Sequence, residues 1–478
     1  MLTKLWIDGG PVSALSGRTY PVVNPADGAL LAKVSEGGAA DIDAAVDAAV
    51  KAAGGPWSRM TARERGRILL KIAGLIRAQR ETLALLECRN AGKPLGDARE
   101  EMDLAADTFE YYGGAANKHF GETIPVSGAG LDYTLREPVG VCGLIVPWNF
   151  PLVIAAWKLG PALACGNTVV LKPSPETPLT ALALAKLAAE AGLPEGVLNV
   201  VPGPGPGCGD ALVRHPKVRK ISFTGSTATG TGIMKEAADG IKRVSLELGG
   251  KSPNIVFDDC DLDLCVEKSV WSVFYNAGQD CCARSRILVH RKLHDKFVDR
   301  LVARTKRFVV GHPEKKGTQI GPVISHRQHS KIAAYIASGK AEGAELLCGG
   351  VRPKGVPKNG FYLSPAVFAG ADAEMRIARE EIFGPVVCVI PFKDEGEAIA
   401  LANDSAYGLS ASVWTRDVGR VLRVTRAVQS GVISVNTSSS VHLEAPFGGY
   451  KGSGLGRELG LKALDLYSEV KNVFISNV

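Results

Sequence analysis

Two adjacent cysteines, Cys281 and Cys282, lie in the segment NAGQDCCARSR at 276–286, between a turn-like stretch and two arginines. A cysteine that only fills a core normally lies in an apolar run, because free cysteine is among the most buried residue types. Adjacent cysteines are poorly placed to bridge each other, because disulfide geometry requires well-separated Cα atoms. The pattern therefore predicts that one of the two is presented for chemistry, as a thiolate nucleophile.

A cysteine that attacks a carbonyl carbon needs an oxyanion donor and a way to resolve the thioester. Asn149 lies in Pro147-Trp-Asn-Phe-Pro151, where two prolines stiffen the backbone and could present the side-chain amide as that donor. Glu247 lies in the otherwise apolar segment 244–248. Burial of that face would raise the pKa of Glu247, which suits a general base. Taken alone, Asn149 also fits a polar turn, and Glu247 also fits a solvated strand face.

Gly225-Ser-Thr-Ala-Thr-Gly230 is predicted to be a loop between a strand and a helix. Free N–H groups and the positive end of the helix would favour a pyrophosphate there. An ordinary turn would look the same, and the segment does not match the G-x-G-x-x-G dinucleotide fingerprint. The segment 203–207 is also rich in glycine. Its prolines lack N–H donors, and we interpret it as a structural turn.

The elements that must position these residues alternate between helical and strand patterns, which predicts an α/β fold with parallel sheets covered by helices. Residues 61–64 form a capping box before a helical apolar repeat. A strand at 169–171, a helix capped by Thr177 with Pro178 in its first position, and a strand at 197–201 make one βαβ unit. Further strands are predicted at 220–223 and 244–248.

Residues 138–157 carry no charge over twenty positions, a length that would suit a membrane helix. Pro147, Asn149 and Pro151 interrupt the middle of this window, where a membrane helix would lose backbone hydrogen bonds. We therefore expect a buried strand at 139–146, a rigid turn and then a helix, with no membrane span.

The bulk composition narrows the class of protein. A chain of 478 residues is too long for one hydrophobic core, so two or three domains are expected. The net charge of +7, the absence of a long basic run and an aromatic content of 6% argue against nucleic-acid or membrane-surface partners. Ten cysteines without a CxxC pair fit a reducing cytoplasm. None of the eight histidines has metal-ligand spacing, so no metal site is predicted.

Six segments together resemble motifs of the NAD(P)-dependent aldehyde dehydrogenase superfamily, in the same order and over nearly the whole chain. They are Pro147–Pro151, Phe223–Ser226, Leu246–Asn254, Gly278–Cys281, Glu380–Pro385 and Pro446–Lys451. In this family the nucleophile is the cysteine two places after the glutamine of a Gly-Gln pair, which here is Cys281. Glu247 matches the general base, and Asn149 matches the oxyanion donor.

The resemblance implies a reaction. Cys281 would attack an aldehyde, a hydride would pass to the nicotinamide, and Glu247 would activate the water that hydrolyses the thioester to a carboxylic acid. Relatives that transfer the acyl group to coenzyme A typically lack this glutamate, so the hydrolytic, non-acylating type is implied.

The resemblance also assigns the remaining site residues. Lys158 and Glu458 match a proton relay, and Phe150, Trp157 and Phe447 match a substrate funnel. The implied cofactor-binding residues are Ile145, Trp148, Lys172, Gly225, Ser226, Glu381 and Phe383. Many NAD-preferring members have a glutamate three residues after the lysine, where this chain has Pro175, and Glu176 follows one place later. NAD is therefore expected, and NADP stays possible.

By resemblance, a Rossmann-type cofactor domain occupies 1–120 and 140–248, and an α/β catalytic domain occupies 249–452. A small β oligomerisation hairpin would join 121–139 to 453–478, giving a homodimer or homotetramer. The strand-like tail at 470–476 suits an exposed edge that pairs with another chain.

The substrate is expected to be a small-molecule aldehyde of medium chain length or with an aromatic group, because the funnel residues are apolar. Glu444 would favour an amino-aldehyde if it lies at the funnel mouth, or it is a solvated loop residue. Two other functions stay open: cysteine-dependent acyl-transfer or esterase chemistry without redox, and a non-catalytic protein on the same scaffold. The first usually needs a histidine, and none is close to Cys281 in sequence. The second predicts loss of Cys281 or Glu247, and both are present.

Overall fold

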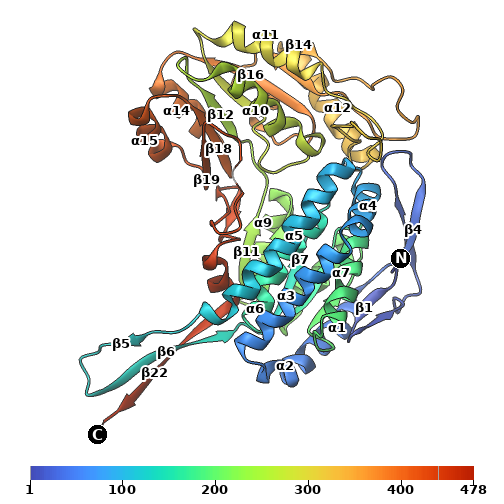
Figure 1. Ribbon diagram of the computed structural model, residues 1–478, viewed down its shortest axis with the longest axis vertical. Coiled ribbons are helices and arrows are strands. Elements are labelled where there is room, and N and C mark those ends of the chain that lie inside the picture. The colour runs from blue at the N-terminus through green and yellow to red at the C-terminus, as the bar shows by residue number, and fades with distance from the viewer. Residues whose placement is uncertain (1, 440, 478) are drawn as a thin grey trace.

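The computed structural model describes residues 2–439 and 441–477, so the outer limits of the predicted domains at Met1 and Val478 lie outside it. Two large sheets form the body, and a small third sheet projects from it (Figure 1). The first sheet has the strand order β2 (Gly10–Val12), β1 (Leu5–Ile7), β9 (Leu198–Val200), β8 (Thr168–Lys172), β7 (Val141–Ile145), β10 (Val218–Thr224), β11 (Arg243–Glu247) and β21 (Gly454–Leu455).

The five central strands of this sheet, from β9 to β11, are all parallel. The chain lays down β7, β8 and β9 in one direction and then returns to place β10 and β11 on the other side of β7. Adjacent loops at the carboxyl ends of β7 and β10 therefore diverge to opposite faces, which is the topological switch point where open α/β sheets bind ligands. The predicted α/β class, with a Rossmann-type first domain, is confirmed.

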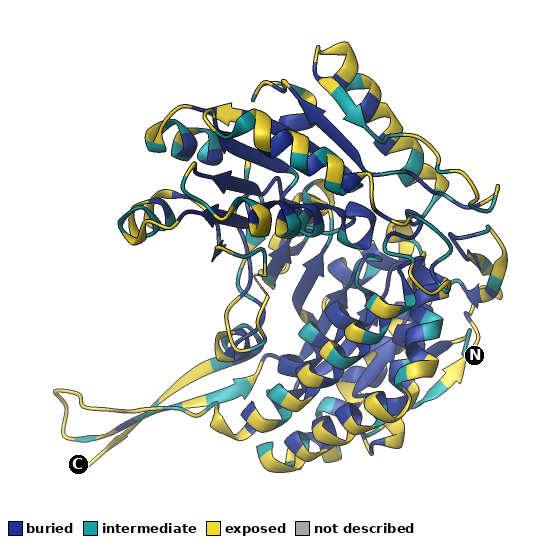
Figure 2. Cartoon of the chain, turned by 45° about the horizontal axis from the view of Figure 1, so that its top comes forward, coloured by how far each residue is buried: buried dark blue, intermediate teal, exposed yellow. Residues whose placement is uncertain are grey.

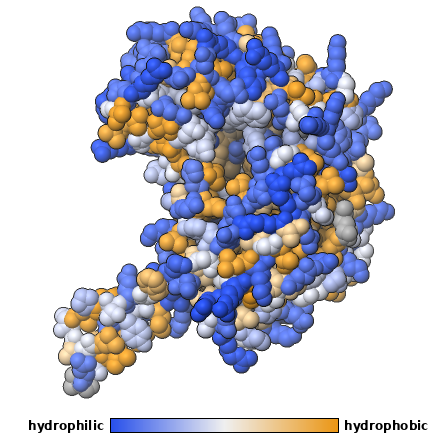
Figure 3. Space-filling model, in the orientation of Figure 1, coloured by the Kyte–Doolittle hydropathy of each residue, from blue (hydrophilic) through white to orange (hydrophobic). Residues whose placement is uncertain are grey.

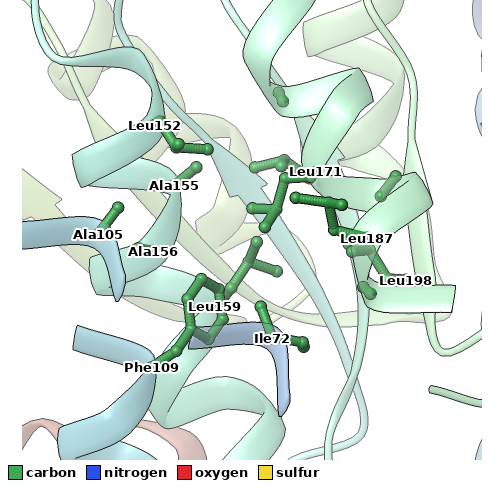
Figure 4. Packing of buried hydrophobic residues seen from close by; sticks show 14 of the residues in the cluster. Ile72, Ala105, Phe109, Leu152, Ala155, Ala156, Leu159, Leu171, Leu187 and Leu198 are labelled. Carbon is green, nitrogen blue, oxygen red and sulfur yellow. The ribbon is translucent and has the colours of Figure 1, made fainter. Parts of the chain in front are cut away.

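Helices cover both faces of the first sheet. One face carries α3 (Ala62–Ala78), α4 (Arg80–Ala91), α5 (Leu95–Ala115), α6 (Pro151–Ala164) and α7 (Leu179–Glu190), and the other carries α1 (Ala39–Ala53), α8 (Asp210–Arg214) and α9 (Thr227–Ala238). An apolar core lies on each face of this sheet. Successive residues of a strand contribute to opposite cores, because side chains along a strand alternate between the two faces. Leu171 and Leu198 thus pack under α6 and α7, where Figure 4 shows them beside Leu159 and Leu187.

Predictions of secondary structure that depend on residues a few positions apart are mostly correct. The capping box of Thr61 and Glu64 starts α3, and the uncharged window forms β7, a turn and α6. The predicted cap at Thr177 is wrong: α7 begins at Leu179 with Pro178 as its N-cap, and the buried Thr177 hydroxyl has no hydrogen-bond partner. Within the described chain, no helix has the length and apolarity needed to span a membrane.

The second sheet has the order β14 (Glu345–Cys348), β15 (Ala366–Ala369), β16 (Val386–Phe392), β13 (Arg286–His290), β12 (Pro253–Val256), β18 (Ser410–Trp414) and β19 (Val432–Val435). Its helices are α10 (Leu262–Phe274), α11 (His294–Thr305), α12 (His326–Ala341), α13 (Arg376–Arg379), α14 (Glu395–Asn403) and α15 (Val418–Ala427). A separate apolar core holds this unit together. The exit of α10 leads through Tyr275–Gly278 to Cys281, so this unit carries the cysteine pair.

The remaining elements are short. They are α2 (Pro56–Arg59), the pair β3 (Thr19–Val23) and β4 (Leu30–Ser35), and the pair β17 (Tyr407–Gly408) and β20 (Tyr450–Lys451).

The third sheet is an arm in which β6 (Gly130–Pro138) pairs with β5 (Thr123–Ile124) and, along nine residues, with β22 (Ser468–Ser476). Figure 2 shows that the arm is mostly exposed. β21 instead joins the first sheet, and the turn Leu461–Tyr467 packs into the first core. We therefore propose that the second part of the oligomerisation element begins at 468 rather than at 453.

Candidate active site

A cavity of about 630 Å³ lies at the carboxyl ends of β7, β8, β10 and β11. Its size suits a cofactor or drug-sized ligand. Residues predicted from the sequence supply much of its lining: Ile145, Trp148, Asn149, Lys172, Gly225, Ser226, Glu247, Cys281, Glu381 and Phe383. The predicted relay residues and funnel residues do not line it.

The β10–α9 connection forms one end of the cavity. Ser226 caps α9 and accepts a hydrogen bond from the Thr229 N–H at 3.3 Å. The predicted loop at 225–230 is therefore shorter than expected, because its second half already belongs to the helix. The N-terminus of α9 still faces the cavity, where its free N–H groups favour an anion.

Lys172 and Glu176 lie farther along the same cavity. Lys172 is buried and donates to the Pro173 carbonyl at 3.1 Å, and burial lowers its pKa. The Glu176 carboxylate accepts a hydrogen bond from the Ser174 hydroxyl at 2.5 Å. Two glycines, Gly205 and Gly209, also line this end. The glycine-rich segment, interpreted above as a structural turn, thus borders the cavity as well.

The other end is shaped by Glu381 and Phe383. Glu381 accepts a hydrogen bond from the Gly250 N–H at 3.0 Å, and burial raises its pKa to about 7. Phe383 has a φ of 58°, which is a strained conformation for a bulky residue. Its ring meets Trp148 edge to face at 5.1 Å, and Gln328 Nε2 donates to its carbonyl at 2.7 Å. Strain that is held so firmly is characteristic of ligand-binding positions.

Cys281 is the cysteine presented to the cavity, whereas Cys282 is buried with 4% exposure. The hydrogen bond with the Cys282 thiol, followed by burial, raises the pKa of Cys281, and Asp280 and Glu381 act in the same direction. The thiol is therefore neutral at neutral pH in the free protein. Its activation requires a base or a positive charge.

Asn149 reaches the segment that carries Cys281 from the β7–α6 turn. Its Nδ2 donates to the Gln279 carbonyl at 3.1 Å, two residues before Cys281. The amide nitrogen has a second hydrogen, which stays available for a ligand oxygen. The side-chain oxygen is buried without a hydrogen-bond partner. The residue is thus held next to the thiol with one donor to offer.

Glu247 ends β11 with 5% exposure, so the interpretation as a solvated strand face does not hold. Its Oε2 atom is buried without a hydrogen-bond partner. Burial, and then the charge of Glu458, raises the pKa of Glu247 well above its usual value, while Lys158 and Arg457 lower it. A carboxylate in this setting is basic enough to remove a proton from water.

The predicted relay residues meet behind Glu247. Lys158 of α6 and Glu458 form a fully buried ion pair. Ser222 of β10 joins both, because it accepts from Lys158 Nζ at 3.0 Å and donates to Glu458 Oε1 at 3.3 Å. This network connects to Glu247 electrostatically through Glu458.

The three predicted funnel residues separate into two groups. Trp157 and Phe447 contact each other at 5.3 Å between ring centroids. They pack in a small apolar cluster that includes the cysteine pair. Four of its residues were not indicated by the sequence: Leu409, Val432, Leu443 and Leu459. Phe150 instead stacks on Tyr275 at 6.1 Å. Glu444 is exposed, which both the funnel-mouth and the solvated-loop interpretations allow.

Among residues 2–439 and 441–477, the only cluster of three or more potential metal ligands is Asp280, Cys281 and Cys282, whose ligand atoms lie within 4.8 Å of one another. These positions are consecutive in the chain and include the presented thiol. The expectation of no metal site stays a prediction.

Several residues at the site had no role predicted for them from the sequence. A methyl group at Gly249 would overlap the Glu381 carboxylate, and one at Gly250 would overlap the Cys281 carbonyl. Lys93 and Asn276 both donate to the Asn149 carbonyl. The glycine pair lies within the motif Leu246–Asn254, which gave it no role, and the other two contacts join segments far apart in the chain.

A parallel sheet with a cavity at its switch point, a helix N-terminus aimed into it and a thiol at its inner end define a dinucleotide-binding α/β protein. Comparison with known proteins then identifies the family. The model of the aldehyde dehydrogenase family matches residues 12–473. The chain therefore belongs to the aldehyde dehydrogenase family, as the six motifs predict, and the predicted enzyme class is confirmed.

Individual relatives match over almost their full length. Human retinal dehydrogenase 2 is 48% identical over 99% of this chain and 92% of its own. Human mitochondrial aldehyde dehydrogenase is also 48% identical, over 99% of this chain and 92% of its own. A solved NAD⁺ complex of Bacillus cereus aldehyde dehydrogenase is 46% identical and has a TM-score of 0.98, covering 100% of this chain and 97% of that one.

Proposed function

We propose that this chain oxidises an aldehyde to the carboxylic acid with NAD, through a covalent intermediate on Cys281. The observation that carries the proposal is that Cys281 and Glu247 line the same cavity as the residues predicted to bind the cofactor. A nucleophile and a base are therefore available at one end of a site whose other end suits a dinucleotide.

The residues present fit a nicotinamide dinucleotide. The N-terminus of α9 and Ser226 suit the pyrophosphate, Lys172 suits the adenosine ribose, and Glu381 suits the nicotinamide ribose. Gly249 leaves the space that the Glu381 carboxylate occupies. When bound, NAD would accept the hydride that leaves the carbon attached to Cys281.

The chain's own residues account for the other steps. Glu247 takes the proton of the Cys281 thiol, and the thiolate attacks the aldehyde carbon. The Asn149 amide with the Cys281 N–H stabilises the resulting oxyanion. After oxidation leaves a thioester, Glu247 takes a proton from water, and the hydroxide attacks that thioester. Lys158 and Glu458 carry the proton away from Glu247. Their buried ion pair and its electrostatic effect on Glu247 support this role.

Glu176 supports NAD as the preferred cofactor. Pro175 occupies the position where many NAD-preferring relatives have a glutamate, but the Glu176 carboxylate lies in the cavity with Lys172 and Ser174. A carboxylate there can accept a hydrogen bond from the ribose 2′-hydroxyl, and it repels a 2′-phosphate. The NAD⁺ complex of the Bacillus cereus relative agrees with this choice.

The substrate that we propose is an apolar aldehyde of medium length or with an aromatic group. Trp157 and Phe447 pack with Leu459 against the cysteine pair, so the side of Cys281 outside the cofactor cavity is apolar. The name of the human relative, retinal dehydrogenase 2, refers to a large apolar aldehyde and supports the same class.

The test is the absorbance of the reduced nicotinamide during turnover. Purified protein is mixed with hexanal, benzaldehyde or an aminoaldehyde, each with NAD and with NADP. We expect absorbance to grow fastest with NAD and one of the first two aldehydes. A kcat/KM that is higher for the aminoaldehyde would contradict the substrate class, and no growth with any pair would contradict the reaction.

We also propose a homodimer or homotetramer assembled through the arm, and a cytoplasmic location. The arm exposes apolar side chains, which supports the assembly. All ten cysteines are free, which supports a reducing compartment.

A further inference from the structure

The turn that carries Asn149 is held by buried ionisable side chains that the proposed reaction does not use. Lys93 follows Gly92, which ends α4 with a φ of 80° and turns the chain inward. The Lys93 side chain has no exposed surface, and its Nζ lies 2.5 Å from both carboxylate oxygens of Glu101. The same Nζ donates to the Asn149 carbonyl at 2.9 Å.

A second buried carboxyl group, that of Glu87, holds the other end of this turn. Glu87 of α4 accepts a hydrogen bond from the Leu152 N–H at 3.2 Å through one oxygen and from the Thr180 hydroxyl at 2.6 Å through the other. The four residues from Asn149 to Leu152 are therefore held at both ends by α4 and the segment that follows it.

The carbonyl that Lys93 holds also joins this turn to the nucleophile segment. Asn276 Nδ2 donates to the Asn149 carbonyl at 3.0 Å and to the Gln279 carbonyl at 3.3 Å. The Asn149 side chain donates to that same Gln279 carbonyl. A shift of the Asn149 backbone would thus move its amide relative to Cys281.

We propose that Lys93, with Glu101 as its counter-ion, is a positioning residue for the oxyanion donor Asn149. The proposal rests on the proposed role of Asn149. An ammonium has three hydrogens, and here Glu101 and the Asn149 carbonyl receive them. Its charge also lies 4.7 Å from the centre of the Phe150 ring, which follows Asn149 in the turn.

Burial of this ion pair indicates a role beyond packing. Removing two charges from water costs several kcal/mol per ion, and apolar residues of similar size often replace such a pair without loss of stability. What an apolar pair cannot supply is a fixed donor to the Asn149 carbonyl. A misplaced reacting group can slow a reaction about 10²-fold.

The test compares Lys93→Met in two backgrounds, the unchanged chain and Asn149→Ala, by the single-turnover rate of reduced-nicotinamide formation. If Lys93 acts through Asn149, Lys93→Met slows the reaction about 10²-fold in the first background and less than about threefold in the second. The Kd of NAD, measured by calorimetry, stays within about threefold of the unchanged chain, because Lys93 does not line the cavity.

Equal losses in both backgrounds, or no loss in the first, would overturn the positioning role. An unchanged rate in Asn149→Ala alone would instead refute the proposed role of Asn149, so the two failures can be told apart. If Lys93→Met leaves Glu101 uncompensated and does not fold, Lys93→Met/Glu101→Met removes both charges and carries the same expectation.

The matched control is Arg80→Met, because Arg80 pairs with Asp103 between α4 and α5 away from the turn. Its rate should be unchanged.

Discussion

Cys281 and Cys282 differ in exposure, and we therefore propose that Cys281 is the one that reacts. Cys281→Ala should lower kcat by more than about 10⁴-fold, whereas Cys282→Ala should keep most of the activity. The Cys282 thiol is the leading cause of the raised pKa of Cys281, so its removal should lower that pKa. Alkylation of Cys281 by iodoacetamide at neutral pH should then be faster in Cys282→Ala. The reverse ranking of the two variants in turnover would mean that the nucleophile is Cys282.

The basicity of Glu247 is set by its surroundings, and the pH dependence of turnover should report it. As the proposed general base, Glu247 must be ionised, so kcat under rate-limiting hydrolysis should fall as the pH drops through its raised pKa. Glu458→Gln removes a charge that raises this pKa and leaves Lys158, which lowers it, without its carboxylate partner. Both effects act in one direction, and the acidic limb should move down by about one pH unit.

The control for this shift is Glu469→Gln. Glu469 pairs with Arg243 at the surface and is not among the groups that shift the pKa of Glu247. Its acidic limb should coincide with that of the unchanged chain. An acidic limb that stays in place or moves upward in Glu458→Gln would show that Glu247 does not control this step.

Glu176 should decide between the two cofactors. Glu176→Gln removes the negative charge that would meet a 2′-phosphate, so the ratio of kcat/KM for NAD to that for NADP should fall about tenfold or more. Glu36→Gln serves as the control, because Glu36 lies outside the cavity lining. An unchanged ratio in Glu176→Gln would show that Glu176 does not take the place of the glutamate that many NAD-preferring relatives have where this chain has Pro175.

At the scale of elements, the segment that follows β11 brings Glu247, Glu381 and Cys281 together. Gly249 lies against the Glu381 carboxylate, and Gly250 lies against the Cys281 carbonyl. Gly249→Ala should displace Glu381 and raise the KM for NAD about tenfold, whereas Gly250→Ala should act mainly on kcat through Cys281. Gly232→Ala in α9 is the control, because a methyl group there meets no neighbour within 4 Å. Equal KM values for NAD in Gly249→Ala and the unchanged chain would contradict this view of the turn.

Element predictions succeeded where the determining interaction is local. The capping box at Thr61 and the proline-interrupted window both depend on residues a few positions apart. The loop predicted at 225–230 was too long because Gly230 is part of α9, where a methyl group would overlap Leu248. That glycine permits close packing between helix and strand. Glycine is needed at 230 because of Leu248, which is distant in the sequence, so a local pattern cannot show the need.

At the scale of the whole molecule, the site depends on contacts across the chain. Asn149 meets Gln279 across 130 positions, and Lys158 meets Glu458 across 300. Resemblance to the family indicated Asn149, Lys158 and Glu458 as site residues, and the structure brings each pair together. Nothing in the sequence indicated that Lys93 would contact the Asn149 carbonyl. A single lysine after a helix gives no pattern, and its partners are fixed only when α4, α5 and the β7–α6 turn pack together.

The arm has an apolar surface that the rest of this chain does not cover. Its large exposed apolar residues are Ile124, Val126, Leu131, Leu135, Val470, Phe474 and Ile475, and apolar patches are visible along it in Figure 3. Among the described strands, β22 is an edge of its sheet, and an exposed edge with apolar side chains is suited to pairing with another chain.

Light scattering should therefore find the unchanged protein as a dimer or tetramer. Val470→Asp places a charge on this edge, where Val470 is 56% exposed, and should shift the mass toward the monomer. Lys471→Arg changes the next residue of the same strand and keeps a cation for the ion pair with Glu137, so it should keep the assembly. NAD binding should persist in both variants, because the cavity is lined by residues outside the arm. A monomeric unchanged protein, or an unaltered mass in Val470→Asp, would remove the arm as the assembly surface.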